Sequence, residues 1–163
     1  MDKQVSGKLE EMHQGQVATG TLARRVVFGA TGALGSAIVR VLTDQGQKVR
    51  AFVRNIEKAR IVLPTEVEMY SGDVLEKEAV RAACMDAEVV YNCVNVPYSK
   101  WETVMPTLVD NTIISASAAG AVLLFPGNVY GYGEFRFQPI TEEHPRHGLG
   151  ERRASCETRW KTA

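Results

Sequence analysis

Residues 26–35 read Val-Val-Phe-Gly-Ala-Thr-Gly-Ala-Leu-Gly, and this stretch decides the fold. It begins as an apolar strand and continues into a turn with glycines at positions 29, 32 and 35. A glycine at the first position allows a tight turn off the strand. One at the second lets backbone amides approach an anion closely, and one at the third lets a helix pack on the sheet without a Cβ between them. The segment therefore predicts a strand, a turn and a helix whose N-terminus faces an anion.

The residues after the turn support a helix. Gly46 stands where a helix C-cap is expected. Apolar residues recur at the spacing of one helix face, namely Leu34, Ala37, Ile38, Val41 and Leu42. A structural turn is the alternative, but the strand and helix that a dinucleotide-binding motif requires are both present, so we interpret it as that motif. The residues expected to contact the diphosphate are Gly29, Thr31, Gly32, Ala33, Leu34 and Gly35.

Composition and charge narrow the function classes. The chain has 163 residues, of which 45% are hydrophobic and 23% charged, as in an ordinary globular protein. Lys plus Arg and Asp plus Glu both total 19, so we expect no nucleic-acid partner. No apolar run approaches the roughly 20 residues of a membrane span, and the N-terminus lacks the apolar core of a signal peptide, so we expect no membrane association.

The three cysteines, Cys84, Cys93 and Cys156, are odd in number and lack metal-ligand spacing, so we expect no metal site. Cys93 falls at the end of an expected strand, where a small buried side chain is more common than a nucleophile. A reducing, cytoplasmic location is the default for such a chain.

Three segments follow from the patterning. Residues 1–22 are polar and without sustained periodicity, which predicts a flexible leader. Residues 23–135 alternate strands and helices, which predicts a dinucleotide-binding domain. Residues 136–163 are rich in proline and glycine at their start and poor in apolar positions at their end, which predicts a loop-rich tail.

Within the domain, five strands alternate with helices. A helix from about Pro106 to Ala119 is expected to begin near the proline, because proline fits only the first turn without a kink. The other expected helices are 56–62 and 75–84, and the expected strands are 25–28, 48–53, 67–70, 88–94 and 121–125. Such alternation implies right-handed crossovers and a doubly wound parallel sheet, a Rossmann-like α/β fold.

Further motifs follow the later strands, and together with the glycines they resemble a known family. They are Gly72-Asp73-Val74, Asn92-Cys93-Val94-Asn95, Val129-Tyr130-Gly131 and the acidic stretch 139–143. In this pattern the chain resembles the NAD(P)-binding short-chain dehydrogenase/reductase superfamily. It is most similar to the extended and atypical branch, which contains nucleotide-sugar epimerases and dehydratases. The resemblance covers residues 24–145.

The resemblance implies roles for the strand ends. Asp73, with Val74, would lie against the adenine, although Asp after Gly is also a common turn or N-cap residue. Cys93, Val94 and Asn95 would line the ribose and nicotinamide side, although Asn95 has capping of a turn as an alternative. The implied function is the NAD(P)-binding domain of an epimerase/dehydratase-like or reductase-like oxidoreductase acting on an unknown small molecule.

Charge at the end of the second strand bears on the cofactor. NAD-selective enzymes place an acidic residue about 20 residues past the glycines, to bind the ribose 2′-hydroxyl. Here Val53 stands near that position and Arg54 follows it. A guanidinium there can bind a 2′-phosphate, whereas the alternative is an exposed arginine at a strand end. We therefore expect NADP, with NAD as the other possibility.

The sequence also departs from the family, which leaves catalysis open. Pro126 occupies the region of the family's catalytic serine, and no Tyr-x-x-x-Lys occurs after residue 133. The chain stops at 163, before the family's sixth strand and substrate-binding lobe, so we expect a truncated sheet. Its open edge would be covered by self-association through the helix at 106–119. A non-catalytic dinucleotide-binding sensor or interaction module, or a truncated inactive product, are the alternatives.

Overall fold

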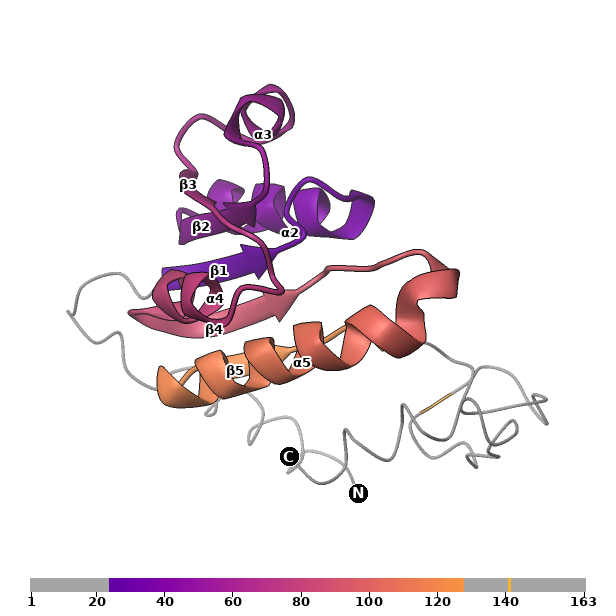
Figure 1. The fold of residues 1–163 in the computed structure, drawn as a ribbon. Coiled ribbons are helices and arrows are strands. Elements are labelled where there is room, and N and C mark those ends of the chain that lie inside the picture. The colour runs from indigo at the N-terminus through magenta and orange to yellow at the C-terminus, as the bar shows by residue number, and fades with distance from the viewer. Residues whose placement is uncertain (1–23, 128–140, 142–163) are drawn as a thin grey trace, which may run out of the picture.

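Strands and helices alternate along the described chain (Figure 1). The computed structural model describes residues 24–127 and residue 141, so the expected segment boundaries after residues 22 and 135 lie outside the described residues. The strands are β1 (Arg24–Phe28), β2 (Lys48–Val53), β3 (Glu68–Ser71), β4 (Ala87–Asn92) and β5 (Val122–Leu124). The helices are α2 (Ala33–Asp44), α3 (Ile56–Val62), α4 (Lys77–Cys84) and α5 (Trp101–Ala118), with a 3-10 turn, η1 (Tyr98–Lys100), before the last.

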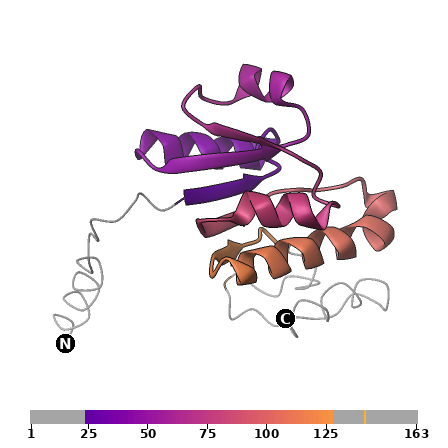
Figure 2. The same ribbon diagram turned by 60° about the vertical axis from the view of Figure 1, so that its left-hand side comes forward.

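All five strands are parallel and lie in the order β3-β2-β1-β4-β5. The predicted doubly wound parallel sheet is thereby confirmed. Helices α2 and α3 cover one face and α4 and α5 the other (Figure 2). Phe28 pairs with Phe52 of β2 and with Asn92 of β4. The carboxyl ends of the strands therefore meet along one border of the sheet, here called the carboxyl edge, and their beginnings form the amino edge.

The core consists of two apolar layers, one on each side of the sheet. β1 contributes to both, because its residues alternate between the faces and all of Val26, Val27 and Phe28 are fully buried. The α2/α3 layer contains Val27, Val39, Leu42, Val49, Ala51, Val53, Ala59, Leu63 and Val67. The α4/α5 layer contains Val26, Phe28, Phe52, Val80, Ala83, Cys84, Ala87, Val90 and Ala116.

The buried face of α2 differs from the expected one. Leu34 and Val41 are 49% and 54% exposed. Leu42 is buried as expected and Ile38 packs against the core, but the other buried residues of this helix are Gly35 and Val39. The reason is the backbone contact that Gly35 makes with the preceding turn, because it fixes the rotation of the helix and brings positions 39 and 42 onto the sheet.

Helix α5 begins at Trp101, so the expectation that it begins near Pro106 was wrong. Pro106 is the sixth residue of this 18-residue helix and cannot donate to the carbonyl four residues earlier. The first turn is supported from outside, since the Trp101 indole N–H donates to the carbonyl of Val96 at 3.0 Å. The other helix and strand ends differ from the expected bounds by at most two residues.

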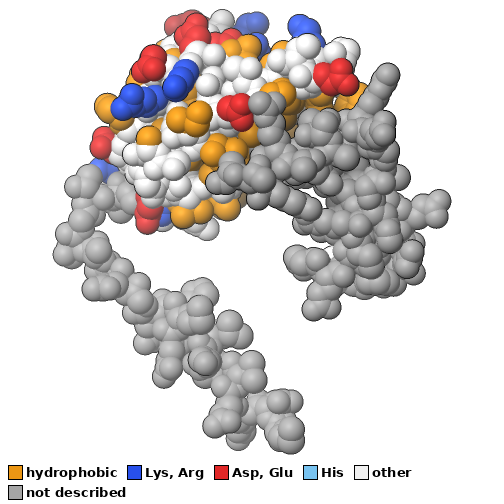
Figure 3. All heavy atoms as spheres, turned by 60° about the horizontal axis from the view of Figure 1, so that its bottom comes forward, with side chains coloured by type: hydrophobic (Ala, Val, Ile, Leu, Met, Phe, Trp, Pro, Cys, Tyr) orange, Lys and Arg blue, Asp and Glu red, His pale blue; other side chains and the backbone are white. Residues whose placement is uncertain are grey.

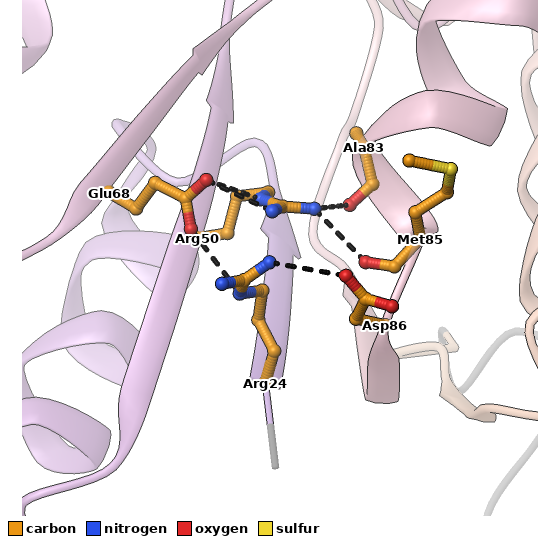
Figure 4. A network of polar contacts seen from close by, with 6 residues as sticks. All are labelled: Arg24, Arg50, Glu68, Ala83, Met85 and Asp86. Atoms are coloured by element: carbon orange, nitrogen blue, oxygen red, sulfur yellow. Dashed lines mark hydrogen bonds and ion pairs between the residues drawn. The ribbon is translucent and has the colours of Figure 1, made fainter. Parts of the chain in front are cut away.

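A polar network stabilises the amino edge (Figure 4). Its centre is Arg50 of β2, which is only 7% exposed. The Arg50 Nε and Nη2 atoms each lie 3.0 Å from one carboxylate oxygen of Glu68, on β3. Arg24 of β1 approaches the other oxygen of Glu68 at 3.3 Å. One carboxylate thus joins the starts of three neighbouring strands.

The same network reaches the end of α4. The Arg50 Nη1 atom donates to the carbonyls of Ala83 and Met85, at 2.8 and 3.1 Å. A guanidinium at the C-terminus of a helix satisfies carbonyls that have no partner within the helix and complements the helix dipole. Asp86, which follows, has a φ of 62° and lies 3.8 Å from Arg24. The turn from α4 into β4 is therefore fixed in place by side chains of β1 and β2.

Candidate functional site

The turn after β1 requires its first glycine. Gly29 has a φ of +70°, and its carbonyl accepts a hydrogen bond from the Gly32 N–H at 3.0 Å. A Cβ at position 29 would lie 2.7 Å from the carbonyl carbon of Cys93 and 2.9 Å from the nitrogen of Val94. Both the backbone conformation and the space therefore exclude a side chain, and the turn lies directly against the end of β4.

The third glycine sets how closely the helix approaches. A Cβ at Gly35 would lie 2.2 Å from the Gly29 carbonyl oxygen, which is not a possible contact. At Gly32 the same distance is 3.3 Å, a milder restriction. The strict steric requirement thus falls on positions 29 and 35, whereas Gly32 leaves its surroundings open.

The N-terminus of α2 offers backbone donors at the carboxyl edge. Its N-cap is Gly32, whose lack of a side chain leaves the helix without a side-chain cap, and its first turn holds no acidic residue. The first hydrogen bond within the helix runs from the Ser36 N–H to the Gly32 carbonyl, at 2.9 Å. The N–H groups of residues 33–35 therefore have no acceptor in the helix. Thr31 and Ala33 are exposed beside them, so an anion can reach these donors.

A pocket of about 360 Å³ joins the glycine turn to the end of β2. It is lined by Thr31, Val53, Arg54, Asn55 and Lys58. None of these lining residues is acidic, and two are cationic and exposed. The Asn55 side chain caps α3 by accepting the Lys58 N–H at 2.9 Å. That cap fixes the start of α3 and so the position of Lys58 beside Arg54.

Lys58 was not among the residues singled out from the sequence. The available signal was its position four residues after Arg54, across an Asn that can cap a helix. Residue 58 lies about one helical turn after the cap, so its side chain is on the same side as the end of β2. The glycine motif alone does not predict that Lys58 lies near Arg54.

Asp73 and Val74 lie beyond the end of β3. The Asp73 Oδ1 atom accepts the Leu75 N–H at 2.9 Å, so the side chain makes the turn that was the alternative to adenine contact. Gly72 before it donates to the Val53 carbonyl at 3.0 Å, which ties this loop to the pocket side of β2. Val74 is half-buried, and its carbonyl accepts from the Asn111 amide at 3.0 Å. Contact of Asp73 and Val74 with the cofactor stays a prediction.

The segment after β4 crosses close to the glycine turn. The Cys93 N–H donates to the Phe28 carbonyl at 3.0 Å and continues the sheet pairing. The Val94 N–H donates to the side chain of Asn92 at 3.2 Å. Asn95 is exposed, and its side chain accepts the N–H of the next residue at 2.9 Å, in line with the turn alternative. Cys93, Val94 and Asn95 therefore lie at the carboxyl edge, on the side of the glycine turn opposite the pocket.

The two described cysteines are in the thiol form at neutral pH. Burial raises the pKa of the Cys93 thiol above its ordinary value. Burial also raises the pKa of Cys84 to about 11, although the positive charge of Arg50 acts in the opposite direction. A thiol is a poor nucleophile and metal ligand, which agrees with a packing role. Among the described residues no cluster of three or more His, Cys, Asp or Glu side chains can hold a metal ion.

The sheet order and the glycine turn at the end of its central strand define a Rossmann-type dinucleotide-binding fold. The sequence model of the NAD(P)H-binding family matches residues 29–158. The chain belongs to this family. The expectation of an NAD(P)-binding domain is therefore confirmed.

Individual proteins are similar to this chain over part of their length. Sterol demethylase protein B of Methylococcus capsulatus is 37% identical over 67 residues, which are 41% of this chain and 20% of that protein. A short-chain dehydrogenase/reductase superfamily protein of Agrobacterium tumefaciens, solved with bound NAD, has a TM-score of 0.61 at 24% identity. The alignment covers 78% of this chain and 40% of that one.

A third protein is an NADPH-dependent quinone oxidoreductase of Escherichia coli, solved with NADPH. Its TM-score is 0.54 at 22% identity, over 62% of this chain and 35% of that chain. The likeness to the two solved structures is one of fold. The matched part is less than half the length of each of these three proteins. Among the described helices, none is long and apolar enough to cross a membrane.

Proposed function

We propose that this NAD(P)-binding domain takes NADP(H) in preference to NAD(H) and serves an epimerase/dehydratase-like or reductase-like oxidoreductase. The observation that carries the cofactor preference is the pocket beside the glycine turn, where Arg54 and Lys58 are two of the five lining residues and no lining residue is acidic. A 2′-phosphate at that place finds two positive charges, whereas the acidic partner that selects a 2′-hydroxyl is missing from the lining.

Each part of the cofactor is assigned here to a segment of the chain, in the order of the sequence. The backbone N–H groups around Gly32 bind the diphosphate, and the helix dipole of α2 adds to the attraction. Arg54 donates in a fork to the 2′-phosphate, and Lys58 adds a point charge. Asp73 and Val74 lie toward the adenine, and the segment from Cys93 to Asn95 toward the nicotinamide. When bound, the nicotinamide supplies or accepts a hydride.

Calorimetric titration of NADPH and NADH into the wild type tests the preference. Arg54→Ala is expected to weaken NADPH binding by roughly ten- to a hundred-fold, because a hydrogen-bonded charge pair contributes about 1.5–3 kcal/mol. Lys58→Ala should have a smaller effect of the same sign. Neither variant should change NADH affinity by more than about two-fold.

Arg60→Ala provides the matched control. Arg60 is an exposed arginine in the last turn of α3 and does not line the pocket, so its removal should leave both cofactors unaffected. Equal affinities of the wild type for NADPH and NADH contradict the proposal. An equal loss in the Arg54 and Arg60 variants would reduce it to general electrostatic attraction.

Catalysis belongs to the same proposal. Neither a non-catalytic sensor nor an inactive truncated product is favoured by the comparisons. The sequence nevertheless lacks the Tyr-x-x-x-Lys of the resembled superfamily, and Pro126 has no hydroxyl to donate. We therefore expect this 163-residue chain to bind the cofactor but not to turn over a substrate by that Ser/Tyr/Lys chemistry. The substrate of the oxidoreductase is an unknown small molecule, and we propose that the protein works in the cytoplasm. NADPH oxidation with a panel of carbonyl compounds and nucleotide sugars checks the expectation, and robust turnover contradicts it.

A further inference from the structure

An exposed aromatic pair stands where the chain leaves β4 for α5. The rings of Tyr98 and Trp101 have centroids 5.1 Å apart and are tilted by 36°. Tyr98 is 59% exposed, whereas Trp101 is half-buried. A large aromatic side chain that is exposed and yet held against a second ring offers a flat surface to a partner.

The support beneath Tyr98 is fixed by hydrogen bonds and packing. The Trp101 indole N–H donates to the Val96 carbonyl at 3.0 Å, and the Lys100 N–H donates to the Pro97 carbonyl at 2.8 Å. Trp101 also packs on the apolar cluster formed by the buried side of α5. The segment before α5 is therefore bound at both ends, and Tyr98 rests on a surface that needs no rearrangement to receive a ring.

The topology places this pair on one side of the glycine turn and the cationic pocket on the other. The pocket lies beside β2, and the glycine turn contacts Cys93 and Val94 after β4. A dinucleotide with its diphosphate at the turn and its adenosine half at the pocket must extend its second half across the end of β4. Tyr98 follows Val94 by four residues, so the two Cα atoms are at most roughly 14 Å apart. Figure 1 shows the segment between β4 and α5 projecting beyond the carboxyl edge.

We propose that Tyr98, supported by Trp101, is the surface on which the nicotinamide ring of the bound cofactor stacks. This inference rests on the proposed function. The face of a phenol ring is electron-rich and attracts a cation, and the oxidised nicotinamide ring carries a positive charge that the reduced ring lacks. Tyr98 therefore stabilises the oxidised cofactor more than the reduced one, which a merely structural aromatic side chain would not do.

The test is a titration of three probes into the full-length chain, comparing the wild type with Tyr98→Ala. The probes are NADP⁺, NADPH and 2′-phospho-ADP-ribose, which lacks the nicotinamide. The expected loss of affinity is about three- to ten-fold for NADP⁺ and smaller for NADPH. Affinity for 2′-phospho-ADP-ribose should not change, which also shows that the variant is folded. Tyr98→Phe keeps the ring and should retain most of the wild-type preference.

Three results overturn the inference. Unchanged binding of all three probes means that the ring lies away from the nicotinamide. An equal loss for all three means that Tyr98 acts on the fold of the site. If the wild type binds neither NADPH nor 2′-phospho-ADP-ribose, the proposed function fails as well, so the two failures are distinguishable.

Discussion

Two arginines four residues apart show how the opposite edges of the sheet differ. Arg50 at the amino edge is buried, and its guanidinium contacts the Glu68 carboxylate and the carbonyls of Ala83 and Met85. Arg54 at the carboxyl edge is exposed and lines a pocket with Lys58. At the amino edge the charge of Arg50 is paired within the protein, whereas at the carboxyl edge Arg54 and Lys58 are exposed around a pocket.

The difference teaches where stability and binding are located. A buried guanidinium is costly to leave unpaired, so its partners are part of the fold. An exposed guanidinium contributes little to the free energy of folding, but it can still contribute to the free energy of binding an anion. The backbone follows the same division, since the carbonyls at the end of α4 are occupied whereas the N–H groups at the start of α2 are not capped by a side chain.

Gly29→Ala is expected to have the largest effect, because it damages the carboxyl edge in two ways. The left-handed conformation costs an alanine about 1–2 kcal/mol, and the contact with Cys93 adds about 1–3 kcal/mol of overpacking. Gly46→Ala is the matched control, since Gly46 has a φ of +72° with nothing within 4 Å of its Cβ position. Chemical denaturation should show the larger loss for Gly29→Ala, and only that variant should lose NADPH binding. Equal losses would contradict the steric argument.

Arg50→Met is expected to lower the free energy of unfolding by about 3 kcal/mol, since it removes the hydrogen bonds to Glu68 and to the end of α4. NADPH affinity should be unchanged at temperatures where the protein is folded. Arg54→Met serves as the opposite case, with little loss of stability and a large loss of affinity. Denaturation and calorimetry on the two variants give a double comparison. A similar loss of affinity in both would mean that the edges are coupled.

Cys84 makes stability depend on pH at the alkaline end. Its folded pKa of about 11 is above the ordinary value of 9.0, so between these values the unfolded chain loses a proton that the folded chain keeps. The stabilisation is complete below about pH 9 and is lost as the pH rises toward 11, by roughly 2 kcal/mol. Denaturation at several pH values should show this fall, and Cys84→Ala should make it shallower. An unchanged slope in the variant would assign the fall to other groups.

The smallest effect is expected for a substitution in β5, at the border of the sheet, and it concerns self-association. Val122 and Leu124 are 60% and 46% exposed on this strand, which pairs only with β4 among the described strands. The side of the molecule that carries α5 and β5 faces the viewer in Figure 3, and hydrophobic side chains are visible on it. We expect weak self-association there, involving α5. Val122→Lys should shift light scattering toward the monomer. A monomeric wild type at high concentration would contradict the expectation.

The order of the elements was predictable because the signals that specify them are local. The alternation of apolar segments and the glycines indicated the sheet class, and α3 has the expected bounds of 56–62, just before Pro64. The rotation of α2 was not predictable from periodicity. Leu34 fits the apolar spacing, yet it is exposed, since the contact between Gly35 and Gly29 decides which face meets the sheet.

The site was predictable where the backbone makes it and less so where side chains do. Gly29 and Gly35 are specified by their spacing. Lys58 was missed because its place in the pocket depends on the cap of α3. The role proposed for Tyr98 had no sequence signal either, since a single aromatic residue in a 3-10 turn forms no periodic pattern. The start of α5 was misplaced at Pro106 because the stabilising partner of Trp101 lies outside the helix.

The sheet order also has a consequence for how the chain is made. Among the strands that the structure describes, the first to be synthesised is the central one, β1, and each later strand pairs with a strand that has already been made. β2 pairs with β1, β3 with β2, β4 with β1 and β5 with β4. The sheet can therefore grow outward during synthesis, first on one side and then on the other, without opening a pairing already formed. The longest delay falls on the β4 side of β1, since Phe28 can pair with Asn92 only after the 64 residues from 29 to 92 have been added.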